Sequence, residues 1–300
     1  FMPMNVLKRH FEGLFGVSII SRSLSIDRLR QEILANSQRK VSRYDIVACD
    51  LPWSGEFVDK GVLLPIGDFI AKSGTDLSDF HDVALASARF CGQQYGLPVQ
   101  TTPELLCVRR DLCEEAGVEV PFTIADTLDT ARLLHNRTKA RSGIAWNAAR
   151  GTPLGHTFMF VMAAMGQPFL NLDRIGDEFD AERPEGERLR PLLQSEEAFA
   201  TAEYLRELLD YSPNSILSMS WYERAKVYAD GEAAMAYCAT LLAPLFELNS
   251  DWPAHGVTEF LPHPCGPRGK PIAPVGGYAL AIPSNVAPKR LTSVWEAVQS

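Results

Sequence analysis

The chain has 300 residues, a formal net charge of −8 and a hydrophobic fraction of 46%. This length exceeds one typical domain, so it predicts either two lobes or one large globular domain. The acidic balance argues against a nucleic-acid partner, because the basic clusters are short and form no basic face. The longest apolar stretch, residues 157–166, is shorter than the ~20 residues that a membrane-spanning helix needs.

The first fifty residues alternate between helix and strand patterns. Apolar residues at helical spacing predict an amphipathic helix over 4–16 and a serine-capped helix over 25–37. Short apolar or β-branched runs predict strands over 17–21 and 44–49. Strands that alternate with helices of this length indicate a parallel sheet that is covered on both faces.

The next segment contains extended backbone interrupted by prolines. Residues 55–70 predict a short helix and a turn, and residues 77–90 predict another capped helix. Residues 93–118 read as two extended runs followed by a helix. Pro98 and Pro103 fall inside the extended runs, which disfavours a central ladder strand and favours a crossing between lobes.

A fresh α/β pattern occupies the second half of the chain. We expect, in order, a helix over 122–136, a strand and loop over 142–151, a buried helix over 152–166, a polar surface excursion over 171–191, a long helix over 195–212, a helix, turn and strand over 220–240, an extended run over 270–284 and a helix from 290. His156 lies on the apolar helix, where a satisfied core histidine is the expected role.

Four stretches of the chain carry a resemblance to a known family. They are "YDIVACDLPWSGEFVDKGVLLPIGDFI" from Tyr44, "YGLPVQTTPELLCVRRDLCEEAGV" from Tyr95, "LRPLLQSEEAFATAEYLRELLD" from Leu189 followed by "WYERAKVYADGEAAMAYCAT" from Trp221, and "PVGGYALAIPSNV" from Pro274. Their order and spacing resemble the extracellular solute-binding proteins of ABC importers, in the sugar-binding class related to maltodextrin-binding protein. The resemblance covers nearly the whole chain.

This resemblance implies a two-lobed α/β fold, the type II periplasmic-binding-protein fold, with discontinuous lobes joined by hinge strands. Lobe 1 would comprise residues 1–103 and 275–300, and lobe 2 residues 104–274. The two lobes of the family close on a solute held between them. The chain lacks the family's first strand and ends before its third crossing and closing helices, so we expect the natural protein to be longer at both ends.

Candidate solute-binding residues follow the ends of the predicted strands, where ligands bind in α/β sheets. Sugars need aromatic faces for their C–H groups, and carboxylates, amides or guanidinium groups for their hydroxyls. The candidates in lobe 1 are Asp50, Trp53, Gln100, Thr101, Gly277 and Tyr278, and those in lobe 2 are Trp146, Asn147, Arg150, Trp221 and Thr240.

Each type of candidate also has a structural alternative. A tryptophan is often buried in a core, and Asp50 could cap a short helix. Arg150 could be a surface cation, whereas a solute-facing Arg150 would favour an anionic or oxidised sugar.

The sequence contains no pattern typical of an enzyme or of a metal site. Serine-nucleophile, zinc-protease, phosphate-loop and CxxC motifs are absent from it, so we predict no catalytic residue, no metal site and no cofactor. The expected partners are a small solute (a sugar, a polyol or a sugar acid) and the membrane subunits of an ABC permease. The expected location is periplasmic or extracellular. The alternative is an effector-sensing domain of a cytoplasmic transcription regulator with the same fold.

Overall fold

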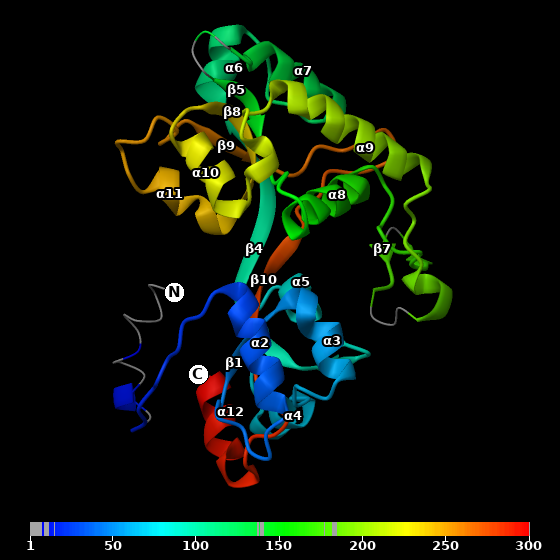
Figure 1. Cartoon of the computed structure of the whole chain (residues 1–300). Coiled ribbons are helices and arrows are strands. Elements are labelled where there is room, and N and C mark those ends of the chain that lie inside the picture. Colours follow the sequence, from blue (N-terminus) through cyan, green and yellow to red (C-terminus); the bar gives the residue numbers. More distant parts are fainter. Residues whose placement is uncertain are drawn as a thin grey trace. The chain divides into compact units, whose positions relative to one another are not determined.

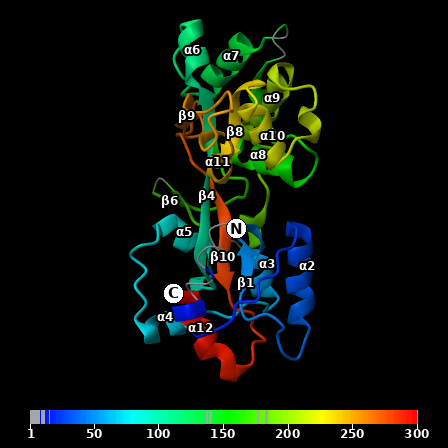
Figure 2. The same cartoon turned by 90° about the vertical axis from the view of Figure 1, so that its left-hand side faces the viewer.

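The computed structural model describes residues 8, 12–14, 16–136, 138, 141–176, 178–181 and 185–299. The predicted helix over 4–16 lies mostly outside these residues. The chain forms two compact units, and Figures 1 and 2 show their elements. Unit 1 comprises Phe1–Thr101 and Gly277–Ser300, and unit 2 comprises Thr102–Gly276. In the described part of the chain, no helix is both long and apolar enough to cross a membrane.

Unit 1 surrounds a short antiparallel ladder. Strand β1 (Val47–Asp50) pairs with β10 (Val275–Ala281), and Asp50 lies opposite Tyr278 at the end of the ladder. The other elements are α2 (Ile26–Ser37), the 3₁₀ helix η1 (Leu51–Trp53), α3 (Ser54–Asp59), α4 (Gly67–Ser73), α5 (Asp82–Ser87), the hairpin strands β2 (Arg89–Phe90) and β3 (Gln93–Gln94), η7 (Pro288–Arg290) and α12 (Leu291–Gln299). Their apolar sides form the core around β1 and β10.

Two sequence-based predictions for this region are wrong. Residues 17–25 form no strand, and Ile20 is 93% exposed, so the β-branched run has neither a ladder partner nor a buried face. The β1–β10 ladder is antiparallel rather than parallel. The reason is topological: the partner of β1 is the segment that returns from unit 2, not the next strand along the chain.

Strand β4 (Gly96–Arg109) runs through both units without interruption. It lies between β10 and β8 (Ala233–Ala239) in the strand order β1-β10-β4-β8-β5 (Figures 1 and 2). The expectation that Pro98 and Pro103 disfavour a central strand is therefore wrong, although the strand does pass from unit 1 to unit 2 as the same pattern suggested. Proline cannot donate to a ladder, but the pairing of β4 with β8 begins at Glu104, after both prolines.

Unit 2 is built on the buried strand β8. This strand pairs antiparallel with β4 and parallel with β5 (Ser142–Ala145), while β9 (Thr258–Leu261) pairs with β4. The long helices are α7 (Ile124–Leu134), α8 (Thr152–Ala164), α9 (Glu196–Leu208) and α10 (Trp221–Ala229); shorter elements are α6 (Arg110–Ala116), the two-residue strands β6 (Arg174–Ile175) and β7 (Glu178–Phe179), η3 (Gly186–Leu189), η4 (Leu209–Tyr211), η5 (Ile216–Ser218), η6 (Thr240–Leu242) and α11 (Pro244–Glu247).

Local sequence explains why these helices begin where they do. Thr123 and Asp126 form a capping box at the start of α7, and Ser220 and Glu223 form another at the start of α10. The alternation of side chains along the strands then separates two cores. Leu106 and Tyr237 face the core that includes α8 and α9, and Cys107 faces the core that includes α10.

Gly277 lets two backbone segments of unit 1 approach closely. Its φ is 137°, and a Cβ at this position would lie 1.9 Å from the carbonyl oxygen of Gln100. We predict that Gly277→Ala lowers the free energy of unfolding by at least about 2 kcal/mol, because it adds both backbone strain and a clash. The matched control is Gly276→Ala, whose Cβ would meet no atom closer than 4.0 Å. Urea unfolding of both variants measures the difference, and equal losses would contradict this account.

Candidate functional site

Two strand ends and the middle of a third strand lie at one edge of unit 2. Because β5 and β8 are parallel, their carboxyl ends, Ala145 and Ala239, lie at the same edge of the sheet. Glu104 in β4 pairs with Ala239, so it belongs to this edge as well. Helix α10 runs into β8 through a tight turn and therefore begins, at Trp221, near the strand's far end. Ligands of α/β sheets bind at such carboxyl ends.

A buried ion pair lies at this edge. The guanidinium Nη1 of Arg224, in the first turn of α10, contacts Oε1 of Glu104. The side chain of Arg224 is 0% exposed and that of Glu104 is 5% exposed. Among the residues that the structure describes, none of the three guanidinium nitrogens has a hydrogen-bond partner apart from this contact. An arginine offers five N–H donors, so much of its bonding capacity is unused here.

Two histidines adjoin the ion pair. The ring of His263 lies 3.9 Å from that of Phe160 and 4.2 Å from that of Tyr237, measured between centroids. Burial lowers the pKa of His263 well below its usual value, and the charge of Arg224 lowers it further. Burial also lowers the pKa of His156, with Glu104 opposing and Arg224 reinforcing the shift. Both imidazoles are therefore neutral near pH 7.

Asn147 completes what we name the polar cluster: Glu104, Asn147, His156, Arg224 and His263. The Asn147 side chain is fully buried, and in the described part of the chain neither its Oδ1 nor its Nδ2 has a partner. Its backbone carbonyl accepts a hydrogen bond from Thr157, the neighbour of His156 in α8. His156 Nδ1 and His263 Nε2 are likewise buried without partners there. Each such group costs about 1–3 kcal/mol, so their concentration at one edge indicates a site for a polar ligand.

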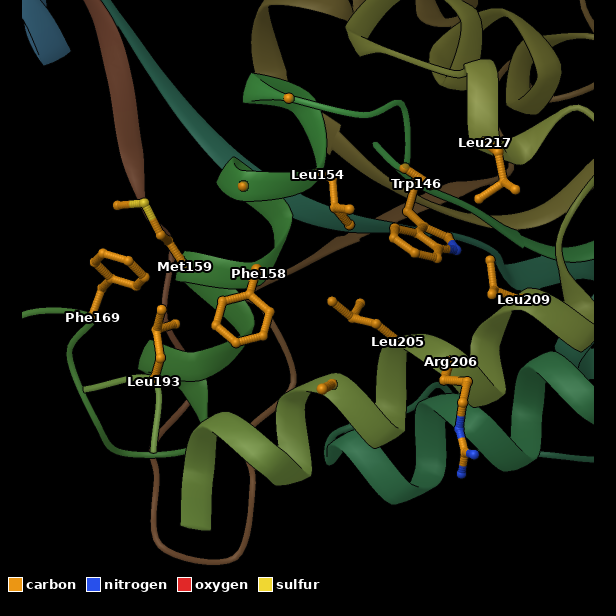
Figure 3. Close-up of a pocket in the computed structure, with 14 residues that line it drawn as sticks. Trp146, Leu154, Phe158, Met159, Phe169, Leu193, Leu205, Arg206, Leu209 and Leu217 are labelled. Atoms are coloured by element: carbon orange, nitrogen blue, oxygen red, sulfur yellow. The ribbon is translucent and has the colours of Figure 1, made fainter. Parts of the chain in front are cut away.

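The structure separates the two tryptophans that were predicted for lobe 2. Trp221 opens α10, is 38% exposed and lies 6.2 Å from the ring of His156. Trp146 is 2% exposed, and its indole N–H donates to Ser212 Oγ at 2.9 Å. Figure 3 shows its ring among the leucines of an apolar pocket of about 590 Å³ between α8 and α9. Arg206 lines the same pocket, but its guanidinium points away from it (Figure 3).

The remaining two candidates of unit 2 come after the ends of β8 and β5. Thr240 directly follows β8, opens η6 and is half-buried. Arg150 precedes α8 and is exposed to solvent. Asn147 and Thr240 thus follow the two strand ends of this edge, and Trp221 opens the helix that begins near it, whereas Trp146 lies in the core.

In unit 1 the structure brings Asp50 and Tyr278 together across the β1–β10 ladder. Burial raises the pKa of Asp50 to about 6, and the N–H of Leu51 opposes this shift. Burial and the nearby Asp50 carboxylate also raise the pKa of Tyr278. Asp50 occupies the N-cap position of η1, but its side chain makes no capping hydrogen bond, so capping does not account for it.

The other candidates of unit 1 lie near these two. Trp53 is half-buried, at the end of η1, with its ring 5.7 Å from that of Phe57. Gln100 and Thr101 lie in β4, and Gln100 lies against Gly277 in β10. The carboxylate of Asp50 has no ion-pair partner within the described residues.

Sequence reasoning missed most of the polar cluster. Glu104 carried a signal, because it is a charged residue at the head of the apolar run "ELLCV". Arg224 carried none, since a cation in the first turns of a capped helix normally faces solvent. His156 was expected to be a satisfied core residue; it is half-buried, with Nδ1 unpartnered among the described residues.

The pH dependence of stability tests the environment of Asp50. Its folded-state pKa, about 6, exceeds the usual value of about 3.9. Between these values the folded protein binds the proton more tightly than the unfolded chain does. The contribution of Asp50 to the free energy of unfolding therefore falls as the pH rises from about 4 to 6, and it stays constant at higher pH.

We predict that Asp50→Asn lacks this contribution. The free energy of unfolding of the variant minus that of the parent protein should be larger at pH 7 than at pH 4. Urea unfolding at both pH values measures the difference, and a stability difference that does not change with pH would show that Asp50 is solvated.

The two tryptophans give a second test. We expect Trp146→Ala to lower the free energy of unfolding by about 3–5 kcal/mol, because a large buried ring is lost from the core. Trp221→Ala should cost less than about 1 kcal/mol, since its ring is partly exposed. Denaturant unfolding compares the two, and similar losses would contradict the separation of core and edge rings.

Comparison with known proteins places this fold in a family. The profile of the family described as bacterial extracellular solute-binding protein matches residues 25–299. An ABC transporter solute-binding protein from Agrobacterium radiobacter, in complex with ribitol, superposes with a TM-score of 0.86 at 22% identity, over 99% of this chain and 72% of that chain. Maltose-bound MalE3 of T. maritima superposes with a TM-score of 0.79 at 20% identity, over 99% of this chain and 72% of that chain.

A third structure, a solute-binding protein from Thermotoga lettingae bound with alpha-D-tagatose, gives a TM-score of 0.80 at 22% identity, over 99% of this chain and 72% of that chain. The predicted α/β fold of two units joined by strands and the resemblance seen in the sequence are both confirmed. The chain belongs to the bacterial extracellular solute-binding protein family.

Proposed function

We propose that this protein is the solute receptor of an ABC-type importer and that it binds a carbohydrate or a polyol. Family membership supports the receptor role. The structurally similar proteins named above were solved with ribitol, maltose and tagatose, and another, from Agrobacterium vitis, with D-mannitol. None of these matches is a transcription regulator, so they give the alternative role no support.

The observation that carries the proposal is the polar cluster, together with the exposed ring of Trp221. Its unpartnered atoms include donors, on Arg224 and Asn147, and acceptors, on Glu104 and Asn147. A hydroxyl is both a donor and an acceptor, so a polyhydroxyl solute satisfies both kinds of group at once. The neighbouring indole offers an apolar face for C–H groups.

In this proposal the candidates of each unit have distinct roles. Asn147 and Thr240 bond to hydroxyls, and Trp221 provides the ring surface in unit 2. Asp50 and Tyr278 are the polar contacts of unit 1, with Trp53, Gln100, Thr101 and Gly277 beside them. We leave Trp146 out, because its N–H has an internal partner and its ring lies in the core.

The proposal extends to location and partners. As an importer's receptor, the protein works in the periplasm or outside the cell, delivers its solute to the permease subunits in the membrane, and is not an enzyme. The description of the family as extracellular and solute-binding supports these features.

Isothermal titration calorimetry tests the function. We expect one compound from a panel of pentitols, hexitols, ketoses and maltose to bind with 1:1 stoichiometry and a Kd of about 1 μM or below, typical of a specific small-molecule site. Trp221→Ala should weaken that binding about two- to ten-fold, the usual contribution of a ring contact. Absence of binding heat across the panel would count against a carbohydrate or polyol solute.

A further inference from the structure

We infer that Glu104 contacts the solute, that Arg224 holds the carboxylate of Glu104 in position, and that the solute is an uncharged polyhydroxyl compound. The inference rests on the proposed function and deepens it, because it assigns residues and a solute charge at the same edge of unit 2.

The first observation is the position of Glu104. It stands where the ladder of β4 with β8 begins, and it is followed by the fully buried Leu106 and Cys107. Its backbone is fixed on both sides, by pairing with Ala239 and by a hydrogen bond from its N–H to the carbonyl of Pro274 at 2.8 Å. The backbone at Glu104 is therefore fixed, one carboxylate oxygen contacts Arg224, and a small part of the side chain is still exposed.

The second observation is that packing alone does not explain this pair. Removing two charges from water costs several kcal/mol for each ion, and apolar residues of similar volume are often equally or more stabilising. A buried pair repays this cost when further hydrogen bonds use its remaining capacity. Here, apart from the contact of Nη1 with Glu104, the guanidinium nitrogens have no hydrogen-bond partner among the described residues. A bound polyhydroxyl compound adds a hydrogen bond to the pair at the carboxylate of Glu104.

The third observation is the charge balance. The carboxylate of Glu104 and the guanidinium of Arg224 neutralise each other, and the other members of the polar cluster, Asn147 and the two histidines, are uncharged. Among the predicted solute-binding residues, Arg150 is the cation, but its side chain is exposed, so solvent screens its charge. A buried anionic solute would find no uncompensated cation in this cluster. Of the predicted solutes, sugar and polyol remain and sugar acid does not.

Calorimetry on variants of the full chain tests these roles. The panel pairs neutral compounds with their acids: ribitol with ribonate, glucose with glucuronate, and also mannitol, tagatose and maltose. We expect the parent protein to bind a neutral member and Glu104→Gln to bind it about 10- to 100-fold more weakly, because a charged acceptor is lost. The matched control is Glu114→Gln, which alters an exposed pair with Arg110 and should leave the affinity unchanged.

Three further variants separate positioning from folding. Arg224→Lys keeps a cation beside Glu104 and should bind the solute at least about ten-fold more tightly than Arg224→Gln. The double variant Glu104→Met with Arg224→Met replaces the pair by apolar side chains of similar length. We expect it to fold with an equal or higher Tm and to lose solute binding.

The outcomes are distinguishable. If the parent protein binds a neutral solute and both Glu104→Gln and the double methionine variant bind it equally well, the inference is overturned while the proposed function stands. If an acid binds more tightly than its neutral partner, the assigned solute charge is overturned. If the parent protein binds no member of the panel, the proposed function fails, and the inference fails with it.

Discussion

The continuous strand β4 is the constraint on which the rest of the structure depends. Because one strand serves both units, the chain can leave unit 1 and open the ladder of unit 2 without a loop. Its early residues, Gln100 among them, lie against Gly277, and its later residues pair with β8 from Glu104 onward. A single extended segment therefore fixes the backbone at candidate residues of both units.

The composition of unit 2 shows how a charged group can be placed inside such a sheet. Strand β8, with the sequence AAMAYCA, is buried throughout and is dominated by small residues. Ala225 and Ala229 of α10 are fully buried in the same core. Small residues let a helix pack closely on a sheet, so an arginine in its first turn can reach the strand end. The ion pair of Arg224 and Glu104 is the result of this close packing.

Local signals in the sequence predicted much of the fold, and tertiary pairing decided the rest. The capped helices α7 and α10 and the buried strand β8 were predictable, because capping and apolar runs are local properties. The direction of the β1–β10 ladder and the absence of a strand over 17–21 were not, since each depends on which distant segment is available as a partner. Features that depend on pairing between distant parts of the sequence could therefore not be predicted from local patterns.

The same division applies to the candidate site. The strand-end rule predicted Asp50, Asn147 and Thr240 as candidates, and the structure places each of them at or just after the end of a strand. It could not separate Trp146 from Trp221, because the choice depends on Ser212, which accepts the indole N–H of Trp146 from another part of the chain. Nor could the rule find Arg224, because this residue lies in helix α10 and its partner Glu104 lies far away in the sequence, in strand β4.

The electrostatics of the two units, each taken by itself, favour the same class of solute. In unit 2 the cation of the polar cluster is already neutralised by Glu104, so an added anion would be buried without compensation. In unit 1 burial raises the pKa of Asp50 to about 6, so at neutral pH this residue presents a carboxylate that repels anions and accepts hydrogen bonds from hydroxyls. An anionic solute would meet a desolvation penalty at the polar cluster of unit 2 and repulsion at Asp50 of unit 1. In each unit, taken by itself, a neutral polyhydroxyl compound avoids that penalty.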